Sequence, residues 1–230
     1  MGTDGGLLAA PVTGLPEILI APAQRVEVLV TASAVPGARY RLRALRFEAD
    51  FLGLGTYADE DLLTLVTTGE AAVAASFIPQ VLRPIENLGE AVVRRIVELG
   101  EVTGLCTRNG ATVAFLINGR IFDPDRVDLV THVGRVESWD VVNSTSMAYP
   151  FHIHGTQFQL VSREIRSVTT PAPYLAWIDT VLAPPGQVAT IKTCQSIPGK
   201  RIFHCHILEH EDSCMMAILD VHNANNEGRT

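Results

Sequence analysis

The chain has 230 residues, of which 47% are apolar and 19% charged, with a formal net charge of −7. This balance is typical of globular proteins and excludes general disorder. The acidic pI near 5.5 argues against a nucleic-acid partner, which requires a basic face. No apolar run reaches the ~18 residues of a membrane-spanning helix, so no membrane partner is expected. The first residues lack a basic start followed by an apolar stretch, so we expect no secretory signal in this sequence.

Short apolar runs separated by glycine and proline predict an all-β fold. Several of these runs carry Val, Ile and Thr with partial alternation, which favours a β-sandwich. The expected strands are 17–21, 25–31, 62–67, 112–116, 126–131, 138–143, 157–162, 187–193 and 215–221. The segment 85–100 differs, because its apolar residues lie near helical spacing and both charge signs are present. It predicts a helix or a connecting segment.

The composition divides the chain into two blocks. Residues 70–84 hold small residues with Pro79 and Pro84, which indicates a linker. We expect a first block at 1–70, a linker with the candidate helix at 71–102, a second block at 103–223 and a tail at 224–230. The first block is short for a complete sandwich, whereas the second has about the right size.

Two short clusters contain five of the seven histidines. In the first cluster, His152 and His154 would project from one face of an extended strand, because strand side chains alternate. In the second cluster, His204 and His206 would share one face while Cys205 points to the other. This alternation predicts two metal sites lying back to back, one built from imidazoles and one from the thiolate.

His210 and Met215 follow the second cluster and can fold back toward Cys205. Thiolate, imidazole and thioether together form the ligand set of a blue-copper centre, with methionine as the weak axial ligand. Structural zinc favours paired CxxC spacing, which the sequence lacks. A cysteine hydrolase is disfavoured, because strand neighbours of Cys205 face away from it. The alternative is a relic motif that no longer binds metal.

Several segments of the chain resemble the multicopper oxidases, in particular the laccase-like and cuprous-oxidase group. The matching segments are 115–120, 122–128, 137–139, 149–158, 177–180, 184–186 and 203–216, with 2–6 and 20–25 in the first block. The resemblance implies the C-terminal half of such an oxidase. Its fold would be a cupredoxin-like Greek-key β-sandwich preceded by a partial second cupredoxin domain.

The resemblance also implies a role for each residue of the two clusters. Type 1 copper ligands would be Cys205, His210 and Met215, the type 2 ligand His152, and type 3 ligands His154, His204 and His206. The implied activity is one-electron oxidation of a phenolic or metal-ion substrate, coupled to dioxygen reduction at a three-copper cluster. The catalytic candidates are Cys205, which would pass electrons to its flanking histidines, and Glu211 or Asp212, which would assist proton delivery. A solvated loop is the alternative interpretation of the two acids.

Three features depart from the family pattern. Tyr149 stands where the pattern has a histidine ligand, and a phenol with a pKa near ~10 is a poor copper ligand at neutral pH. Cys214 stands where the pattern has glycine before the axial methionine. The chain offers four of the eight histidines that the three-copper cluster needs. These departures leave two alternatives open: a non-catalytic copper-binding cupredoxin module, or a β-sandwich repurposed for a copper-independent role.

The remaining expectations concern location, partners and local structure. The resemblance implies a periplasmic or secreted protein, with either further copies of the chain or a polypeptide carrying the missing domain as partner. Asn118 and Gly119 predict a hairpin turn. Cys106 and Cys194 are expected to be thiols rather than a bridge.

Overall fold

The computed structural model describes residues 1–33, 35–49, 55–70, 77–103 and 113–223. Within these ranges the regular structure consists of β-strands and one short helix, α1 (Leu208–Asp212). No helix in the described part of the chain has the length and apolarity needed to span a membrane. The predicted all-β fold class is confirmed.

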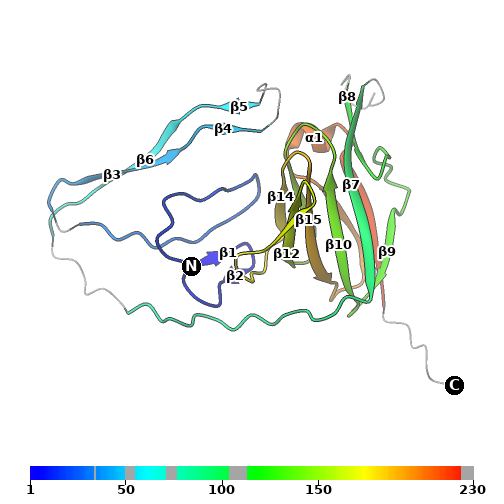
Figure 1. The fold of residues 1–230 in the computed structure, drawn as a ribbon, viewed down its shortest axis with the longest axis horizontal. Helices are drawn as coiled ribbons and strands as arrows, with labels where there is room; N and C mark the ends of the chain where they lie inside the picture. The colour runs from blue at the N-terminus through cyan, green and yellow to red at the C-terminus, as the bar shows by residue number, and fades with distance from the viewer. Residues whose placement is uncertain (34, 50–54, 71–76, 104–112, 224–230) are drawn as a thin grey trace.

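Two sheets pack face to face in the C-terminal part of the chain (Figure 1). The six-stranded sheet contains, in spatial order, β13 (Val168–Pro171), β12 (Phe158–Ile165), β15 (Gln187–Cys194), β10 (Val136–Asn143), β7 (Val93–Thr103) and β8 (Val113–Ile117). The five-stranded sheet contains β14 (Thr180–Ala183), β11 (Tyr149–Ile153), β16 (Gly199–Cys205), β17 (Met216–His222) and β9 (Leu129–His132). Because β7 pairs with β10 and β9 pairs with β17 in parallel, the connections cross over as in a Greek-key sandwich.

The core between the two sheets is rich in aromatic side chains. Trp139, Phe151, Phe158 and Phe203 are fully buried. The ring of Phe203 meets Trp139 edge-on at 5.6 Å and Phe151 at 6.0 Å, geometries that aromatic pairs favour. This packing holds β11 and β16, the strands that carry the two histidine clusters, in fixed positions.

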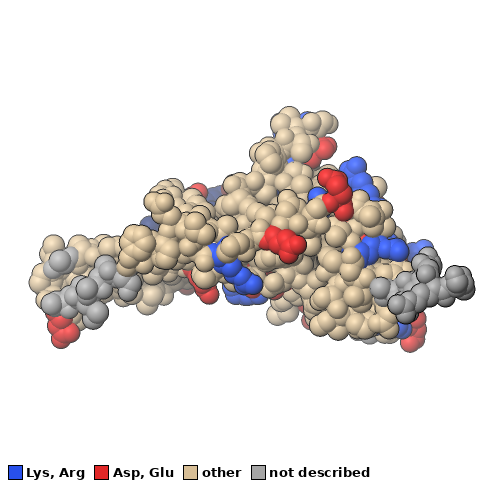
Figure 2. Space-filling view, turned by 90° about the horizontal axis from the view of Figure 1, so that it is seen from below, with Lys and Arg blue, Asp and Glu red and all other residues tan. Residues whose placement is uncertain are grey.

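The N-terminal block consists of short strands outside the sandwich. They are β1 (Gly2–Thr3), β2 (Gly6–Leu7), β3 (Arg39–Ala44), β4 (Phe47–Glu48), β5 (Thr56–Tyr57) and β6 (Glu60–Val66). The ribbon formed by β3 and β6 reaches away from the sandwich (Figure 1). Figure 2 shows a face on which uncharged residues dominate and charged side chains are scattered.

The helix expected within 85–100 is wrong, because this segment contains most of β7. Val97 and Leu99 point into the core, and Arg95 lies on the same face, where it pairs with buried Glu137. Ile96 is exposed on the opposite face. The sequence does not show the apolar–polar alternation typical of a strand here, because the charged residue Arg95 points inward and the apolar residue Ile96 points outward. Residues 93–102 therefore belong to the sandwich rather than to a linker, while the division into a partial middle domain and a C-terminal domain stays a prediction.

Two further expectations about the strands fail. Residues 17–21 and 25–31 form no strand, and their one ladder contact is an isolated bridge between Gly2 and Glu27. The structure also has strands where none was expected: β1 to β5 in the N-terminal block, and β13 and β14 in the sandwich. Apolar composition alone does not make a strand, because each strand needs a neighbour for its backbone hydrogen bonds.

The predicted turn at Asn118 and Gly119 is confirmed. Both residues have positive φ, 52° and 70°, as a type I′ turn requires. The backbone amides of Ile117 and Arg120 each donate to the other's carbonyl at 3.1 Å and close the turn.

Candidate metal centre

The pairing of β11 with β16 brings the two histidine clusters together. His152 lies opposite His204 in the antiparallel ladder, and Phe151 lies opposite Cys205. His154 and His206 follow directly after the two strands. Because neighbouring strand residues face opposite sides, the four imidazoles gather on one side and Cys205 lies on the other.

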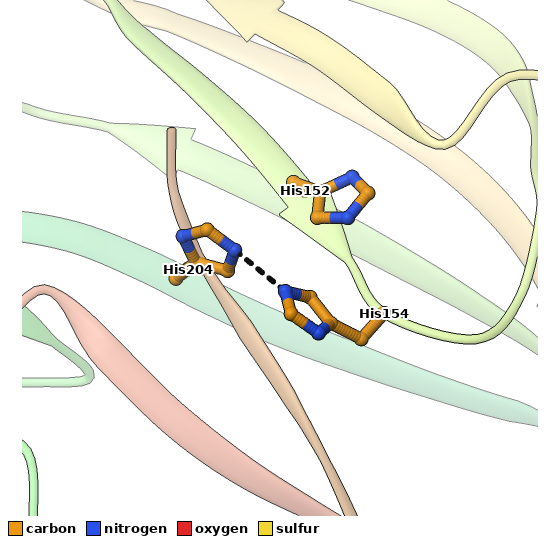
Figure 3. A group of neighbouring side chains, drawn as sticks. All are labelled: His152, His154 and His204. Atoms are coloured by element: carbon orange, nitrogen blue, oxygen red, sulfur yellow. Dashed lines mark hydrogen bonds between the residues drawn. The ribbon is translucent and has the colours of Figure 1, made fainter. Parts of the chain in front are cut away.

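The imidazole rings of this histidine cluster lie close together. Ring centroids are 5.0 Å apart for both His152–His154 and His154–His204, and 5.2 Å apart for His204–His206. The Nε2 atoms of His154 and His204 are 2.9 Å apart, and ligand atoms of His152, His154 and His204 all lie within 4.8 Å of one another (Figure 3). Three nitrogens converging on one point fit a metal ion that takes imidazole ligands.

Hydrogen bonds at the far side of two rings fix their orientation. His152 Nδ1 lies 2.7 Å from the Asp179 carbonyl oxygen and 3.0 Å from Thr180 Oγ1. His204 Nδ1 donates to the Cys205 carbonyl oxygen at 2.7 Å. In both rings Nδ1 is held by an acceptor, so Nε2 is directed toward the cluster. Such contacts orient the ligands of metal sites in general.

The cluster also favours the neutral form of histidine. Burial, together with the charges of the neighbouring imidazoles, lowers the pKa of His204 to about 4, and its hydrogen bond to the Cys205 carbonyl acts in the opposite direction. Burial and the charges of His152 and His206 likewise lower the pKa of His154. Neutral imidazole is the form that binds metal, so a proton competes weakly for these nitrogens at neutral pH.

The acidic candidates differ in their positions. Glu211 Oε2 lies 3.3 Å from His204 Nδ1, and its side chain is 31% exposed, so it links the cluster to solvent. Asp212 is exposed at the end of α1. Of the two, Glu211 is the residue that touches a cluster histidine.

On the other side of β16, Cys205 meets His210. Helix α1 carries His210 back over the strand end, so that Cys205 Sγ lies 3.6 Å from His210 Nδ1. A metal about 2.3 Å from sulfur and about 2.0 Å from nitrogen in a tetrahedral arrangement needs nearly the same separation. Met215 is fully buried in the same core, and its amide donates to the His210 carbonyl oxygen at 3.0 Å. The pair formed by Cys205 and His210 therefore fits one soft metal ion.

Burial dominates the chemistry of this thiol–imidazole pair. Burial raises the pKa of the Cys205 thiol to about 12, with a hydrogen bond from the Ile207 amide acting in the opposite direction. Burial lowers the pKa of His210 to about 4, and its ring stacks on Phe115 at 3.9 Å. Without a metal ion the pair is neutral at pH 7. Metal binding would therefore release the thiol proton.

Tyr149 adds no nitrogen to this pair. Its ring lies 5.4 Å from the His210 ring, but its hydroxyl accepts from Thr145 Oγ1 at 3.1 Å and donates to Glu101 Oε2 at 3.3 Å. Burial raises the pKa of Tyr149 well above its usual range, so the phenol stays protonated. Among the described residues, the thiol–imidazole pair has a single imidazole.

Cys214 occupies a backbone conformation that glycine favours. Its φ is 84°, in the region that side chains with a Cβ disfavour, and the residue is buried against Ala114. The same position is glycine in the family pattern, and this positive φ gives the physical reason.

The expectation for Cys106 and Cys194 involves Cys106, which lies outside the described residues. Cys194 is a half-buried thiol, and burial raises its pKa.

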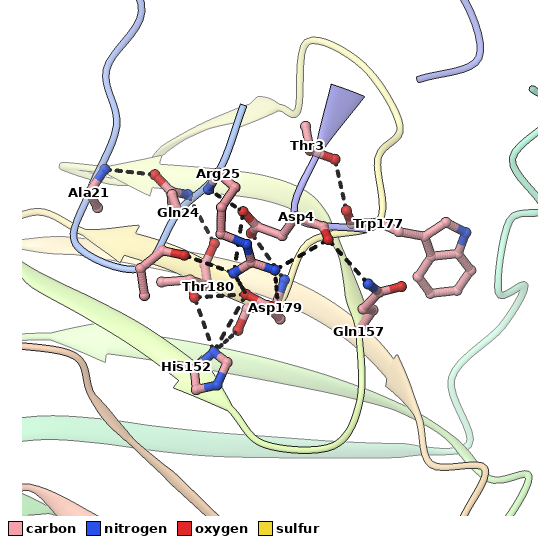
Figure 4. Close-up of polar contacts among 11 residues, drawn as sticks. Thr3, Asp4, Ala21, Gln24, Arg25, His152, Gln157, Trp177, Asp179 and Thr180 are labelled. Carbon is pink, nitrogen blue, oxygen red and sulfur yellow. Dashed lines mark hydrogen bonds and ion pairs between the residues drawn. The ribbon is translucent and has the colours of Figure 1, made fainter. Parts of the chain in front are cut away.

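An ion-pair network behind His152 was not anticipated from the sequence. Arg25 donates from both Nη atoms to the Asp179 carboxylate, at 2.9 and 2.6 Å (Figure 4). Burial opposes ionisation of Asp179, yet hydrogen bonds from His152, Arg25 and Thr180 bring its pKa well below the usual range. The sequence did contain a signal for this network, because segments 20–25 and 177–180, which hold Arg25 and Asp179, both matched the family pattern. An open cavity of about 620 Å³, lined in part by His152, Asp179 and Arg83, lies beside this network.

The chain is similar to known proteins in both sequence and structure. The chain is 29% identical over 97% of its length to the multicopper oxidase mco of Staphylococcus haemolyticus, and it covers 42% of that protein. It is 29% identical over 96% of its length to a laccase of Bacillus subtilis, of which it covers 45%. Its structure matches a multicopper oxidase of Campylobacter jejuni, described as a metallo-oxidase, with a TM-score of 0.83 and 31% identity, over 97% of this chain and 48% of that one.

The chain thus spans less than half of the length of these relatives. Residues 98–225 match the family model described as multicopper oxidase, and this range includes both histidine clusters and the thiol–imidazole pair. The chain belongs to the multicopper oxidase family.

Proposed function

We propose that this chain is a copper-binding part of a laccase-like multicopper oxidase. In this proposal Cys205, His210 and Met215 hold one copper ion, and His152, His154, His204 and His206 contribute to a dioxygen-reducing cluster. The observation that carries it is the arrangement across β16, where imidazoles converge on one side and the thiol meets His210 on the other. Bound copper would supply one-electron oxidation of a phenolic or metal-ion substrate.

The chain's own residues support such chemistry in three ways. The peptide bonds that join His204, Cys205 and His206 connect the two sides of β16 directly. Low pKa values keep His204 and His210 available as neutral ligands. Glu211, partly exposed and 3.3 Å from His204 Nδ1, can carry a proton between solvent and the histidine cluster.

A second candidate function is a copper-binding module without oxidase turnover. The position of the Tyr149 hydroxyl favours it, because that oxygen is bound to Thr145 and Glu101 and the thiol–imidazole pair has a single imidazole. The four histidines of the cluster would also need imidazoles from elsewhere to complete a three-copper centre. A location in the periplasm or outside the cell, and a partner that supplies those imidazoles, are part of the same proposal.

The experiment is copper stoichiometry with an absorption spectrum, after anaerobic loading with Cu(I) and reoxidation in air. A strong blue band with oxygen-dependent oxidation by the unsubstituted chain supports the oxidase, since thiolate-bound cupric ion gives this colour. A blue band without oxygen consumption supports the non-catalytic module. Bound copper with a blue band only in Tyr149→His supports the non-catalytic module, and Tyr149→Phe is the matched control. No bound copper, with stability unchanged by a chelator, contradicts both and supports a copper-independent sandwich.

A further inference from the structure

Three residues from distant parts of the chain form a closed ring of polar contacts behind His152 (Figure 4). Arg25 places its guanidinium on both oxygens of the Asp179 carboxylate. The backbone amide of Arg25 donates to Asp4 Oδ1 at 2.6 Å, and the backbone amide of Asp179 donates to Asp4 Oδ2 at 3.2 Å. The Asp4 side chain is only 2% exposed. A carboxylate buried to this degree needs such partners, so Asp4 fixes Arg25 and Asp179 relative to each other.

This ring of contacts continues to the metal-facing imidazole. Thr180 Oγ1 donates to Asp179 Oδ1 at 3.0 Å, which leaves its lone pairs directed at His152 Nδ1, 3.0 Å away. The carbonyl oxygen of Asp179 accepts from the same nitrogen at 2.7 Å. With Nδ1 held as the donor, the Nε2 lone pair of His152 points into the histidine cluster. The guanidinium of Arg25 therefore fixes the position of the Asp179 carboxylate, and this carboxylate orients the Thr180 hydroxyl.

The same region fastens the N-terminal segment to the sandwich. The Gly5 amide and Thr3 Oγ1 both donate to the Trp177 carbonyl oxygen, at 2.9 and 2.8 Å. Gln24 Nε2 donates to the Thr180 carbonyl oxygen at 2.9 Å. The contacts that fasten residues 3–5 and 24–25 and those that orient His152 therefore share one short stretch, 177–180.

We propose that Arg25 is a positioning residue that couples docking of the N-terminal segment to metal binding at the histidine cluster. The proposal rests on the proposed function, since it assumes that the cluster binds metal. Coupling of two equilibria is reciprocal: if the docked segment raises the affinity for metal, bound metal strengthens docking by the same factor. An arginine that only fastened two parts of the fold would stabilise docking without changing metal affinity.

The test is a titration of the full chain with Zn²⁺, a redox-inactive ion that imidazole binds, followed by NMR of the ring nitrogens of His152, His154 and His204. Arg25→Gln is expected to lower the affinity at these rings ~10-fold, the size typical of losing a contact behind a metal ligand. Arg25→Lys, which keeps the charge but not the two-pronged contact, is expected to lose less. If Arg25→Gln does not fold, Arg25→Lys decides the result.

Arg94→Gln is the matched control. Arg94 is also an exposed arginine on a nearly buried aspartate, Asp140, with a contact of 2.6 Å, but it lies in the six-stranded sheet. The zinc affinity of Arg94→Gln is expected to equal that of the unsubstituted chain. An equal loss in both variants would overturn the proposal, because it would reflect general destabilisation.

Hydrogen exchange supplies the reciprocal measurement. In the unsubstituted chain, zinc is expected to slow hydrogen exchange of the Gly5 and Arg25 amides ~10-fold. This factor equals the loss of zinc affinity expected for Arg25→Gln, because the coupling is reciprocal. In Arg25→Gln this zinc-dependent slowing is expected to disappear. Unchanged affinity in Arg25→Gln would overturn the coupling alone, with the proposed function intact. No zinc-dependent change at any cluster histidine of the unsubstituted chain would overturn both.

Discussion

Leu42 of β3 and Val97 of β7 are both apolar residues in the interior of a strand, yet Leu42 is 59% exposed and Val97 is fully buried. The difference comes from what faces each strand. Strand β7 lies in a six-stranded sheet covered by a second sheet, whereas β3 pairs with β6 alone in a two-stranded ribbon. The comparison shows that an apolar side chain stabilises a strand only when a second layer removes it from water.

The polar contacts of the two regions differ in the same way. In the ribbon, Arg41 and Arg43 pair with Asp61, and all three side chains are more than 40% exposed. In the sandwich, Arg95 pairs with Glu137, whose side chain is 2% exposed. Exposed pairs contribute little, and breaking a buried pair is costly. We therefore expect equal substitutions to have unequal effects in the two regions.

The largest expected contrast is between two Phe→Ala substitutions. Phe203→Ala removes a fully buried ring between Trp139 and Phe151 and is expected to lower the free energy of unfolding by ~3–5 kcal/mol. Phe77, which is 85% exposed, is the matched control. Phe77→Ala is expected to change the free energy of unfolding by less than ~0.5 kcal/mol. Denaturant unfolding followed by tryptophan fluorescence measures both. Similar losses in the two variants would mean that the segment around Phe77 is packed as tightly as the sandwich.

The next contrast concerns the ion pairs. Arg95→Gln leaves a buried Glu137 carboxylate with Thr131 and Trp139 as its donors among the described residues, and is expected to cost ~3 kcal/mol. Arg41→Gln in the ribbon is expected to cost less than ~1 kcal/mol. The same denaturant titration measures both variants, and a cost for Arg41→Gln equal to that of Arg95→Gln would contradict the contrast.

The buried pair also predicts a pH dependence. Burial alone would raise the pKa of Glu137. Hydrogen bonds from Arg95, Thr131 and Trp139 outweigh burial and lower this pKa in the folded chain. A lowered pKa adds stability above the unfolded-state value, near ~4.3, which is lost as the pH falls through the folded-state value. Arg95→Gln is therefore expected to weaken this acid-induced loss. Unfolding curves between pH 7 and pH 3 measure it, and an unchanged slope would show that Glu137 is not the group responsible.

Metal binding is expected to separate the regions further. Cu(I) at one hundred times its dissociation constant is expected to raise the unfolding free energy of the sandwich by ~2.7 kcal/mol, because it binds only the folded state. The amides of β3 and β6 are expected to exchange at an unchanged rate, since no candidate ligand lies in the ribbon. Hydrogen exchange with and without metal tests this directly. Protection spreading into β3 and β6 would join the ribbon and the sandwich into one cooperative unit.

The smallest contrast is between two glycines with positive φ. Gly119→Ala strains the turn after β8, where φ is 70°, and is expected to cost ~1 kcal/mol of sandwich stability. Gly37 has φ of 74°, but Gly37→Ala strains the turn before β3, so the unfolding midpoint of the sandwich is expected to stay unchanged. A shift of that midpoint with Gly37→Ala would show that the ribbon contributes to the sandwich's stability.

The strands that were predictable have regular alternation and apolar inward positions. In β15, Ala189 and Ile191 are buried while Thr190 and Lys192 are partly exposed, as a half-buried strand requires. Strand β7 escaped prediction because Arg95 points inward, where Glu137 neutralises it. That partner lies 42 residues further along the chain and is invisible to any local pattern.

The candidate site shows the same limit. Alternation along His204, Cys205 and His206 predicted two opposite faces from the sequence alone, and the spacing of His210 predicted its return toward Cys205. The contact between Glu211 and His204 depends on the helical turn of α1, and the hydroxyl partners of Tyr149 come from two other segments. These features depend on tertiary contacts, which local spacing does not encode.

The hydrogen bond between Asp4 and Asp179 joins residues separated by 175 positions in the sequence. Contacts of such separation form late, because a long loop must close before they stabilise the chain. During synthesis Asp4 emerges long before Asp179, the residue that it finally contacts. The orientation of His152 would then be completed among the last steps of folding, at the point where the chain becomes ready for metal.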